Sequence, residues 1–382
     1  MSNHAKRRIR PVLVLALPLV ILAAALAASC KYDGQGSITN QHATLGTKGL
    51  WIANGTNVLE YVPNQMIGGT ANVGPLVVSS GAFGSPQGVQ FDANGNLWVL
   101  DSAAMVNGVA TAAVLGFSAS QVGALATSNA PEPVTVITST ALKLPQQSVF
   151  DSQGDQWITD HDNNTILVFT AAQLGQTGLN ISPAVIISST ALNGPTGVAF
   201  DGAGNLWVAN DGDVPQSSGG TSSAGTTIVE FAAAKLPTPP TTGMLTPDLA
   251  PDITLNDDGD SSIQGPWALA FDADGNLWSS NAVSATVVEF AKSSLATSGK
   301  PTPAAILSST TVSGNAALDA PHGLCFDDQG NLVAVSSAGP FAVALFAKSQ
   351  LATGAPTPDT LFIGSATGLS APQGCVFGPA IM

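Results

Sequence analysis

Charged residues, and basic ones above all, are scarce in this 382-residue chain. Only 9% of its residues are charged, and no arginine lies beyond Arg10. Four of the 11 basic residues precede residue 11, so seven lysines face 25 acidic residues in the rest of the chain, a formal net charge of −18. Nucleic-acid binding needs clustered Lys and Arg, and arginine is the usual clamp for phosphate. This composition argues against nucleic acids, anionic lipid surfaces and phosphorylated substrates as partners.

Cysteine is also scarce, with three residues in the whole chain. Two of them lie in similar segments: Cys325 is the second residue after Gly323, and Cys375 is the first after Gly374. Side chains alternate between the two faces of a strand, so this offset directs the two thiols to opposite faces and makes a disulfide difficult to form. We expect both to be free, small, buried apolar residues.

The beginning of the chain is typical of an exported protein. A basic segment is followed by an apolar run, residues 11–28, and then by Cys30, which is the pattern of a secretory signal. Residues 26–30, LAASC, resemble a bacterial lipobox, whose cysteine is lipidated. We expect a signal peptide over 1–29, lipidation at Cys30, and a polar tether over 30–48 that contains His42. The protein would then lie in the periplasm or on the cell surface, with the lipid as its membrane contact. Ordinary cleavage nearby and an uncleaved anchor are the alternatives.

One motif recurs through the rest of the chain. It reads GVAFDGAGNLWVAN at residues 197–210, and related whole copies begin at residues 88, 148, 268 and 323. The front half alone stands at 374–377, and the back half alone at 49–54. Five whole units and two complementary halves make six.

Each unit reads as four short strands. Val-x-Phe alternates as a strand does, Asp-x-x-Gly-Asn makes a tight turn, Leu-Trp-Val forms a second strand, and two further apolar segments follow. Four antiparallel strands are one propeller blade. The C-terminal half would complete a blade whose other strands are 50–53, 58–61 and 76–78. We therefore predict an all-β, six-bladed β-propeller over 49–382, with a seven-bladed ring as the alternative.

The repeats resemble those of the NHL-repeat propellers, which read Pro-x-Gly-Val-x-hydrophobic-Asp and then Gly-Asn-hydrophobic-aromatic-Val-Ala-Asp. The resemblance covers residues 49–382. It implies that ligands bind on the face where the inner strands begin, around the mouth of the central channel.

Five tryptophans share one register in the second strand, and Val333 takes that place in the remaining unit. We expect them to pack between blades, with ligand stacking as the alternative. The aspartates of the turns are expected to stabilise those turns, with calcium binding as the alternative. The tryptophans and the aspartates are Trp51, Trp98, Trp157, Trp207 and Trp278, and Asp92, Asp151, Asp201, Asp272 and Asp327.

Two sets of residues are expected around the channel mouth. The first follows the proline that begins each inner strand, a position usually followed by glycine: Gln87, Gln146, Thr196, Trp267, His322 and Gln373. The second ends each second strand: Asn54, Asp101, Asp160, Asn210, Asn281 and Ser336.

An aromatic residue among amides suits a neutral, hydroxyl-rich ligand, and Trp267 is out of register with the other tryptophans. We predict a monomeric binding module for a glycan, with a peptide or an envelope protein as other partners. An indole that merely plugs the channel is the alternative. Two long loops, 211–226 and 256–264, adjoin the same sector, and the acidic one is a candidate calcium loop. The expected ligand-binding residues are Trp267, Gln87, Gln146, Thr196, Gln373, Asn210 and Asn281.

Two enzyme families offer a distant resemblance and a second hypothesis. Gluconolactonase-like propellers bind calcium partly through Asn and Asp of the Pro-x-Gly position, where this chain has no carboxylate; Asp101 and Asp160 are the candidates left for calcium or magnesium. Streptogramin lyases use a histidine with a magnesium-linked carboxylate, for which His322 and His161 are the candidates. His161 lies between two aspartates, which would raise its pKa. We expect a binding module without a cofactor, with a lyase or lactone hydrolase as the alternative and a structural spacer as a third reading.

Overall fold

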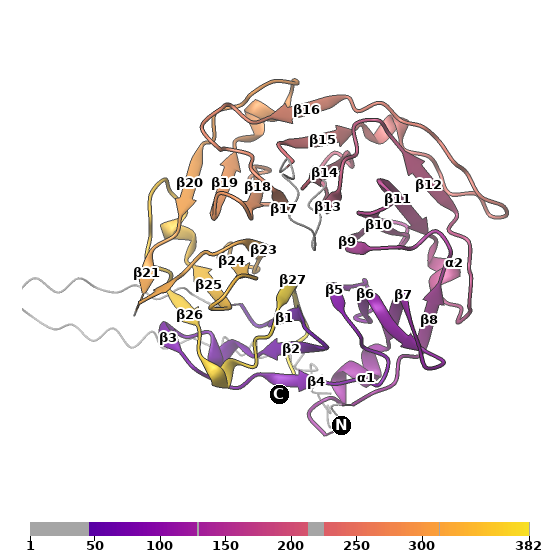
Figure 1. Cartoon of the computed structure of the whole chain (residues 1–382), viewed down its shortest axis with the longest axis horizontal. Helices are drawn as coiled ribbons and strands as arrows, with labels where there is room; N and C mark the ends of the chain where they lie inside the picture. Colours follow the sequence, from indigo (N-terminus) through magenta and orange to yellow (C-terminus); the bar gives the residue numbers. More distant parts are fainter. Residues whose placement is uncertain (1–45, 128–129, 213–224, 313, 382) are drawn as a thin grey trace, which may run out of the picture. The chain divides into compact units, whose positions relative to one another are not determined.

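The computed structural model describes residues 46–127, 130–212, 225–312 and 314–381, all in the compact unit His42–Met382. Six four-stranded antiparallel blades surround a central axis, and a fifth strand joins one of them (Figure 1). The six-bladed propeller is confirmed. The predicted signal peptide, Cys30, His42 and most of the tether lie outside the described residues. Among the described residues, no helix is long and apolar enough to cross a membrane.

The blades follow one another along the chain. Blade one is β5 (Pro86–Phe91), β6 (Leu97–Val106), β7 (Val109–Phe117) and β8 (Thr135–Thr138). Blade two is β9 (Pro145–Phe150), β10 (Gln156–Asp160), β11 (Thr165–Phe169) and β12 (Val185–Ser188). Blade three is β13 (Pro195–Phe200), β14 (Leu206–Asn210), β15 (Thr227–Phe231) and β16 (Ile253–Asn256). Blade four is β17 (Pro266–Phe271), β18 (Leu277–Asn281), β19 (Thr286–Phe290) and β20 (Ala305–Ser308).

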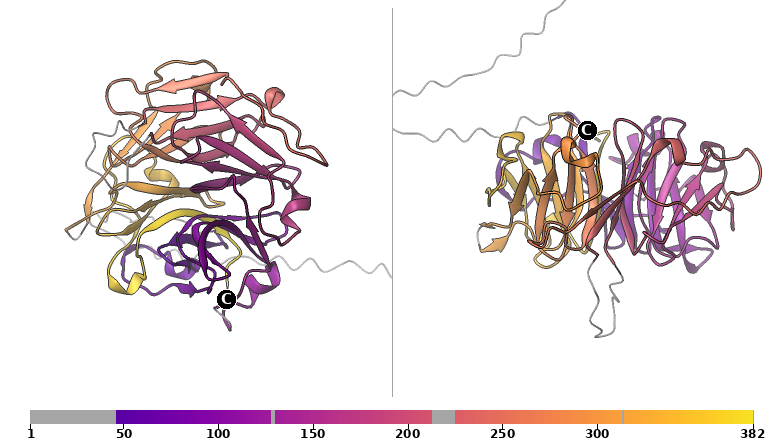
Figure 2. Two further views of the ribbon diagram at one scale, coloured as in Figure 1. Left: turned by 45° about the vertical axis from the view of Figure 1, so that its right-hand side comes forward. Right: turned by 90° about the horizontal axis from the view of Figure 1, so that it is seen from above.

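Blade five is β23 (Pro321–Phe326), β24 (Leu332–Ser336), β25 (Ala342–Phe346) and β26 (Thr360–Phe362). Blade six combines both ends of the ring: β27 (Pro372–Gly378), β1 (Gly49–Asn54), β2 (Asn57–Tyr61) and β4 (Leu76–Val78). The remaining elements are short: β3 (Gly69–Ala71), the hairpin β21 (Thr311–Val312) and β22 (Asn315–Ala316), and two helices, α1 (Ala119–Gly123) and α2 (Ala171–Leu174). The blades stand side by side around the ring when it is seen edge-on (Figure 2).

The turn aspartate of each repeat stabilises its own blade. In blade three, Asp201 Oδ1 accepts the N–H of Ala203 at 2.8 Å and of Asn205 at 3.0 Å, while Oδ2 accepts the indole N–H of Trp207 at 3.1 Å. Blades one, two and four repeat the bond between aspartate and tryptophan. These carboxylates serve the turn, as predicted.

The repeated tryptophans pack between blades. All five are at most 5% exposed, and each indole lies against the phenylalanine that ends the inner strand of the following blade. The ring centroids are 5.3 Å apart for Trp51 and Phe91, and 5.9 Å for Trp278 and Phe326. This contact confirms the packing prediction.

The outer strands of blades one to five are covered by a segment that the sequence did not predict. The segment that connects the third and outer strands of the next blade runs parallel to each of these outer strands. At blade two, for example, Ile186 donates its N–H to the carbonyl of Leu245, and Leu245 donates to the carbonyl of Ala184, both at 2.9 Å. Paired edges do not recruit other chains, so this arrangement protects the rim of the ring.

Blade six closes the ring as predicted. Strand β27 pairs antiparallel with β1, with Leu50 opposite Phe377. The turn that joins these two strands in other blades does not exist here, because they are opposite ends of the propeller. The C-terminal segment takes its place: the carbonyl of Pro379 accepts the indole N–H of Trp51 at 3.0 Å, and Ile381 donates its N–H to Glu60 Oε1 at 2.8 Å.

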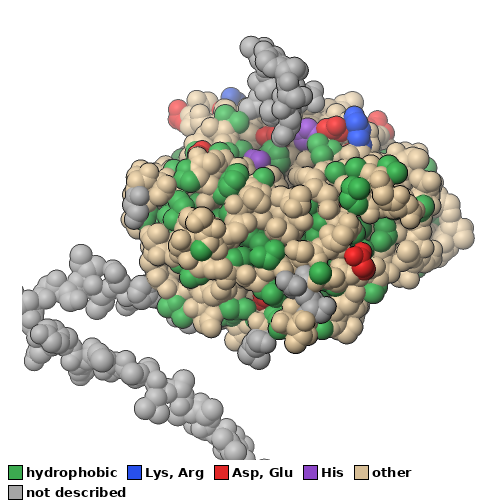
Figure 3. All heavy atoms as spheres, turned by 60° about the horizontal axis from the view of Figure 1, so that its bottom comes forward, with side chains coloured by type: hydrophobic (Ala, Val, Ile, Leu, Met, Phe, Trp, Pro, Cys, Tyr) green, Lys and Arg blue, Asp and Glu red, His purple; other side chains and the backbone are tan. Residues whose placement is uncertain are grey.

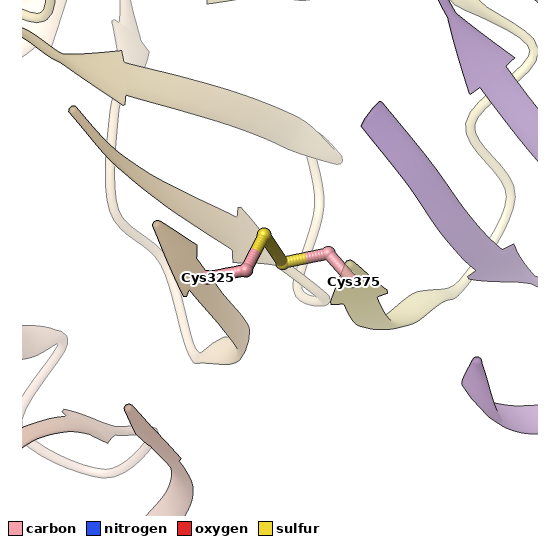
Figure 4. Close-up of a disulfide and its surroundings, with 2 residues drawn as sticks. All are labelled: Cys325 and Cys375. Carbon is pink, nitrogen blue, oxygen red and sulfur yellow. A yellow bond between two sulfur atoms is a disulfide. The ribbon is translucent and has the colours of Figure 1, made fainter. Parts of the chain in front are cut away.

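A disulfide joins Cys325 and Cys375, so the prediction of two free cysteines is wrong (Figure 4). Their Cα atoms are 6.1 Å apart, on the inner strands of blades five and six. Neighbouring blades meet face to face, so a side chain on the forward face of one blade meets a side chain on the backward face of the next. The opposite orientation of the two thiols therefore brings them together.

Candidate ligand site at the channel mouth

Contacts link the first residues of the inner strands across blades three to six. The hydroxyl of Thr196 donates to the carbonyl of Pro266 in blade four at 3.1 Å. The indole of Trp267 stacks on the imidazole of His322 in blade five, with centroids 3.7 Å apart and planes 5° from parallel. His322 in turn hydrogen-bonds to Gln373 in blade six. One arc of the mouth is thus a continuous set of polar and aromatic side chains.

The histidine of this arc is held neutral. Its Nδ1 lies 2.7 Å from Gln373 Oε1, and because that oxygen can only accept, Nδ1 carries the proton and Nε2 keeps a lone pair. Burial lowers the pKa of His322 to about 4, although the bond to Gln373 opposes the shift. At pH 7 the stack offers a neutral acceptor. The Trp267 side chain is 7% exposed, and no hydrogen bond within the described ranges engages its N–H.

The opposite arc is more self-contained. Gln87 donates from Nε2 to the hydroxyls of Ser85 at 2.9 Å and Ser102 at 3.2 Å. Gln146 is 5% exposed, whereas Thr196, at the end of the first arc, is fully buried. Of the predicted ligand residues, the structure brings Trp267 and Gln373 together through His322, and it places the other members of the first set outside that stack.

The residues that end the second strands hold loops in place. Asp101 accepts the N–H groups of Gly84 and Ser85 at 2.9 and 2.8 Å. Asn210 instead accepts one N–H, from Asn193, and donates to the carbonyl of Ala191. In these two blades the side chain is thus an aspartate where the preceding loop presents two N–H groups, and an asparagine where it presents one N–H and one carbonyl.

The same role applies to Asp160 and Asn281, the other two predicted site residues of this set. Asp160 accepts the N–H groups of Lys143 and Leu144, and Asn281 donates to the carbonyl of Ser262. Burial raises the pKa of Asp101 and of Asp160 against these hydrogen bonds. In the part of the chain that the structure describes, no group of three or more His, Cys, Asp or Glu is placed to hold a metal ion.

A third set of mouth residues was not recognised in the sequence. Each follows the end of a second strand and donates its N–H to the carbonyl of the residue before the proline that begins the inner strand of the same blade, as Asp211 does to Gly194 at 2.9 Å and His161 to Leu144 at 3.0 Å. Aligning the repeats at their strand ends would have revealed the set. Its members are Ser102, His161, Asp211, Ala282, Ser337 and Gly55.

The ionisable members of this third set lie on blades two and three. His161 Nδ1 is 3.0 Å from Asp162 Oδ1, and Lys143 Nζ is 3.5 Å from the other oxygen of Asp162. Burial raises the pKa of Asp211 to about 6, and the charge of His161 opposes that shift. Among the residues described, no hydrogen bond, ion pair or ring contact joins His161 to His322. The structure therefore does not pair the two predicted catalytic histidines.

A narrow cavity of about 240 Å³ lies directly beneath the mouth, lined by the inner strands. Its walls include Val198, Leu269 and Leu324, and the disulfide borders it. On the face drawn in Figure 3, hydrophobic and uncharged atoms prevail, and most of the few histidine, acidic and basic atoms gather along the upper rim.

No protein-family model matches the chain, and no curated protein matches it in sequence. Solved structures of similar fold do exist. A putative 6-phosphogluconolactonase from Bacteroides fragilis NCTC 9343 is 14% identical with a TM-score of 0.52, over 90% of this chain and 99% of its own. A streptogramin B lyase is 15% identical with a TM-score of 0.41, over 69% of this chain and 66% of its own. Virginiamycin B lyase from Staphylococcus aureus is 14% identical with a TM-score of 0.42, over 79% of this chain and 71% of its own. At such identities the first of these similarities supports the propeller fold alone.

Proposed function

We propose that this protein is an exported, lipid-anchored propeller of the NHL-repeat type that binds a neutral, hydroxyl-rich ligand of the glycan class at its channel mouth. The observation that carries the proposal is the stack of Trp267 on His322, with Gln373 hydrogen-bonded to the imidazole. Three adjacent blades contribute to it, so the rigid ring fixes its geometry.

The polar groups of this stack are uncharged and complementary to hydroxyls. Nε2 of His322 is an acceptor, while the amide of Gln373 and the indole N–H of Trp267 are donors. A sugar hydroxyl donates and accepts, so it can pair with both kinds of group. An aromatic wall with a few fixed polar groups is the usual construction of a small-molecule site.

Two features support export. The basic and apolar N-terminal residues followed by Cys30 are those of a lipoprotein signal. The disulfide between Cys325 and Cys375 is of the kind that forms and persists in oxidising compartments.

A second candidate function is that of a propeller lyase or lactone hydrolase, and the group around His161 favours it. That histidine is hydrogen-bonded to Asp162, and the buried carboxylate of Asp211 lies on the neighbouring blade. The lowered pKa of His322 makes that residue a weak base at neutral pH. Turnover of a streptogramin or a lactone that His161→Ala abolishes would favour this function.

The direct test is a screen of the purified protein, residues 31–382, on an array of neutral oligosaccharides, followed by calorimetric titration of the best ligand. We expect Trp267→Ala and Gln373→Ala each to weaken binding at least about 10-fold, since each removes part of one site. Leu179→Ala, which truncates a side chain that is 56% exposed, is the matched control and should bind as the wild type does. Melting curves confirm that each variant is folded. Equal affinity in all four proteins, or no ligand on the array, would overturn the proposal.

A further inference from the structure

The carboxylate of Asp211 has no partner in the described structure. The residue is 2% exposed, and its N–H is bonded to the carbonyl of Gly194. Among the residues described, no hydrogen bond reaches its carboxylate oxygens, and no basic nitrogen lies within 4.0 Å of them. A largely buried carboxylate without a protein partner keeps only part of its hydration, and the Asp211 oxygens retain a small contact with solvent. A donor from outside the chain would restore that balance.

Two glycines make room for the side chains of the third set. A Cβ at Gly265 would lie 2.7 Å from Val283 Cγ2 and 3.1 Å from Asp211 Oδ1, and a Cβ at Gly194 would meet the carbonyl oxygen of Gly212 first and then His161 Nε2 at 2.9 Å. Both glycines have positive φ, but the equivalent residues of blades five and six, Ala320 and Ala371, adopt φ of 45° and 63° with a Cβ. The backbone conformation therefore tolerates alanine here, and the glycine at 265 leaves the space that Asp211 occupies.

The chemistry of the surroundings selects the donor. An anion is disfavoured beside a carboxylate that forms no ion pair with a lysine among the described residues. A divalent cation needs several anionic oxygens, and the described residues offer no such group. An ammonium group is a compact cation with three donors. All three of its donors could be used by the carboxylate and by hydroxyl or carbonyl oxygens around it.

We propose that Asp211 binds a protonated primary amine, so that among hydroxyl-rich ligands of the glycan class the mouth prefers one that also carries an amino group. This inference rests on the proposed glycan site and names one substituent of its ligand. It assigns a function to Asp211, a residue that the stack of Trp267 and His322 does not use.

The test compares three sugars that differ at one position: glucosamine, N-acetylglucosamine and glucose, each titrated by NMR at pH 7. We expect the wild type to bind glucosamine at least about 10-fold more tightly than the other two, because a charge-assisted hydrogen bond is much stronger than a neutral one. Asp211→Asn should reduce the preference to within about twofold. Gly265→Ala should also reduce it, by displacing the carboxylate. Asp260→Asn, an exposed acidic residue of the same sector, makes the same change in net charge and should keep the preference.

Two further titrations separate the possible failures. If the three sugars bind equally and Trp267→Ala abolishes all of them, the amine inference fails and the glycan site stands. If no sugar binds but propylamine does, and Asp211→Asn abolishes it, the amine site stands and the glycan proposal fails. If neither sugar nor propylamine binds, both fail. Calcium chloride that raises the melting temperature of the wild type but not of Asp211→Asn would show a metal site and overturn the inference. Removing a buried charge should not unfold the ring, and a melting curve of each variant checks this.

Discussion

The innermost and second strands are connected differently in blades one to five and in blade six. In the continuous blades, a covalent turn joins the first two strands, and in four of them its aspartate holds the tryptophan N–H. In blade six these strands are the two ends of the propeller, and a backbone carbonyl at Pro379 replaces the aspartate. The comparison shows which contacts are needed when chain continuity is lost.

Further contacts stabilise blade six at the seam, where the two ends of the propeller meet. The disulfide ties the C-terminal strand to blade five, and Tyr61 stacks on Phe362 of that blade with centroids 4.4 Å apart. The hydroxyl of Tyr61 donates to the carbonyl of Thr367 at 2.6 Å. Terminal strands normally fray first, so these contacts make the seam cooperative with the rest of the ring.

Deleting residues 373–382 should have the largest effect on this seam. It removes most of β27 and uncovers apolar side chains of β1, such as Leu50 and Ile52, which are fully buried. Each exposed side chain costs about 1.5–3 kcal/mol. We expect the truncated protein to melt at least about 10 °C lower, or not to fold, in a circular dichroism experiment. Melting like that of the full-length protein would show that the closure is not essential to the ring.

The double substitution Cys325→Ser and Cys375→Ser should come next. The bridge spans 50 residues of sequence, and a loop of that size corresponds to a loss of about 4 kcal/mol by chain entropy. Urea denaturation of the oxidised wild type and of the variant measures the difference. The wild type in reductant is the control and should match the variant. Two reactive thiols in the denatured, oxidised wild type would contradict the bridge.

Glu60→Gln tests a buried carboxyl that belongs to the seam. Burial raises the pKa of Glu60 to about 7, against the hydrogen bond from Ile381, and Oε2 has no partner. The folded chain holds the proton more tightly than the unfolded chain. The resulting stability is therefore fully present below pH about 4.5 and lost as the pH rises through about 7.

We expect Glu60→Gln to be more stable than the wild type at pH 8 by about 1–2 kcal/mol, with little difference at pH 4.5. Denaturation curves at several pH values measure this. Asp260→Asn is the control and should leave the pH profile unchanged. A profile for Glu60→Gln that parallels the wild type would show that Glu60 does not titrate with folding.

Trp51→Phe and Trp278→Phe form a matched pair, and the difference between their losses of stability is the smallest effect that we expect. The first loses an indole bond to a neutral carbonyl, worth about 1 kcal/mol. The second removes a donor from the Asp272 carboxylate, so its loss should be larger, at about 1.5–3 kcal/mol. Equal losses in urea denaturation would mean that the two acceptors are energetically equivalent.

The fold could be predicted from the sequence because each repeat carries its own local signals. Val-x-Phe, Asp-x-x-Gly-Asn and Leu-Trp-Val each specify a strand or a turn without reference to distant residues. The two half-motifs then implied the pairing of β27 with β1. The covered outer edges were not predicted, because the connections that cover them lack strand-like alternation.

The site could be predicted less completely, because it depends on contacts between blades rather than on signals within one repeat. The position of Trp267 and His322 in the repeat predicted that both face the mouth, but their stacking depends on the distance between blades four and five. The disulfide was missed because strand faces were considered within one blade, whereas the bond crosses between two. Asp211 was not predicted, because the absence of a partner for its carboxylate depends on the folded arrangement of its neighbours and is not visible in the sequence.

The most direct test of the proposed mouth site is the nitrogen-15 spectrum of the His322 imidazole, recorded with and without the selected oligosaccharide. We expect a neutral imidazole ring at pH 7 with the proton on Nδ1. We also expect that the Nε2 resonance shifts when the sugar binds, and that the shift disappears in Trp267→Ala. An Nε2 resonance that stays unchanged while the ligand is shown to be bound would place the ligand elsewhere and contradict the account.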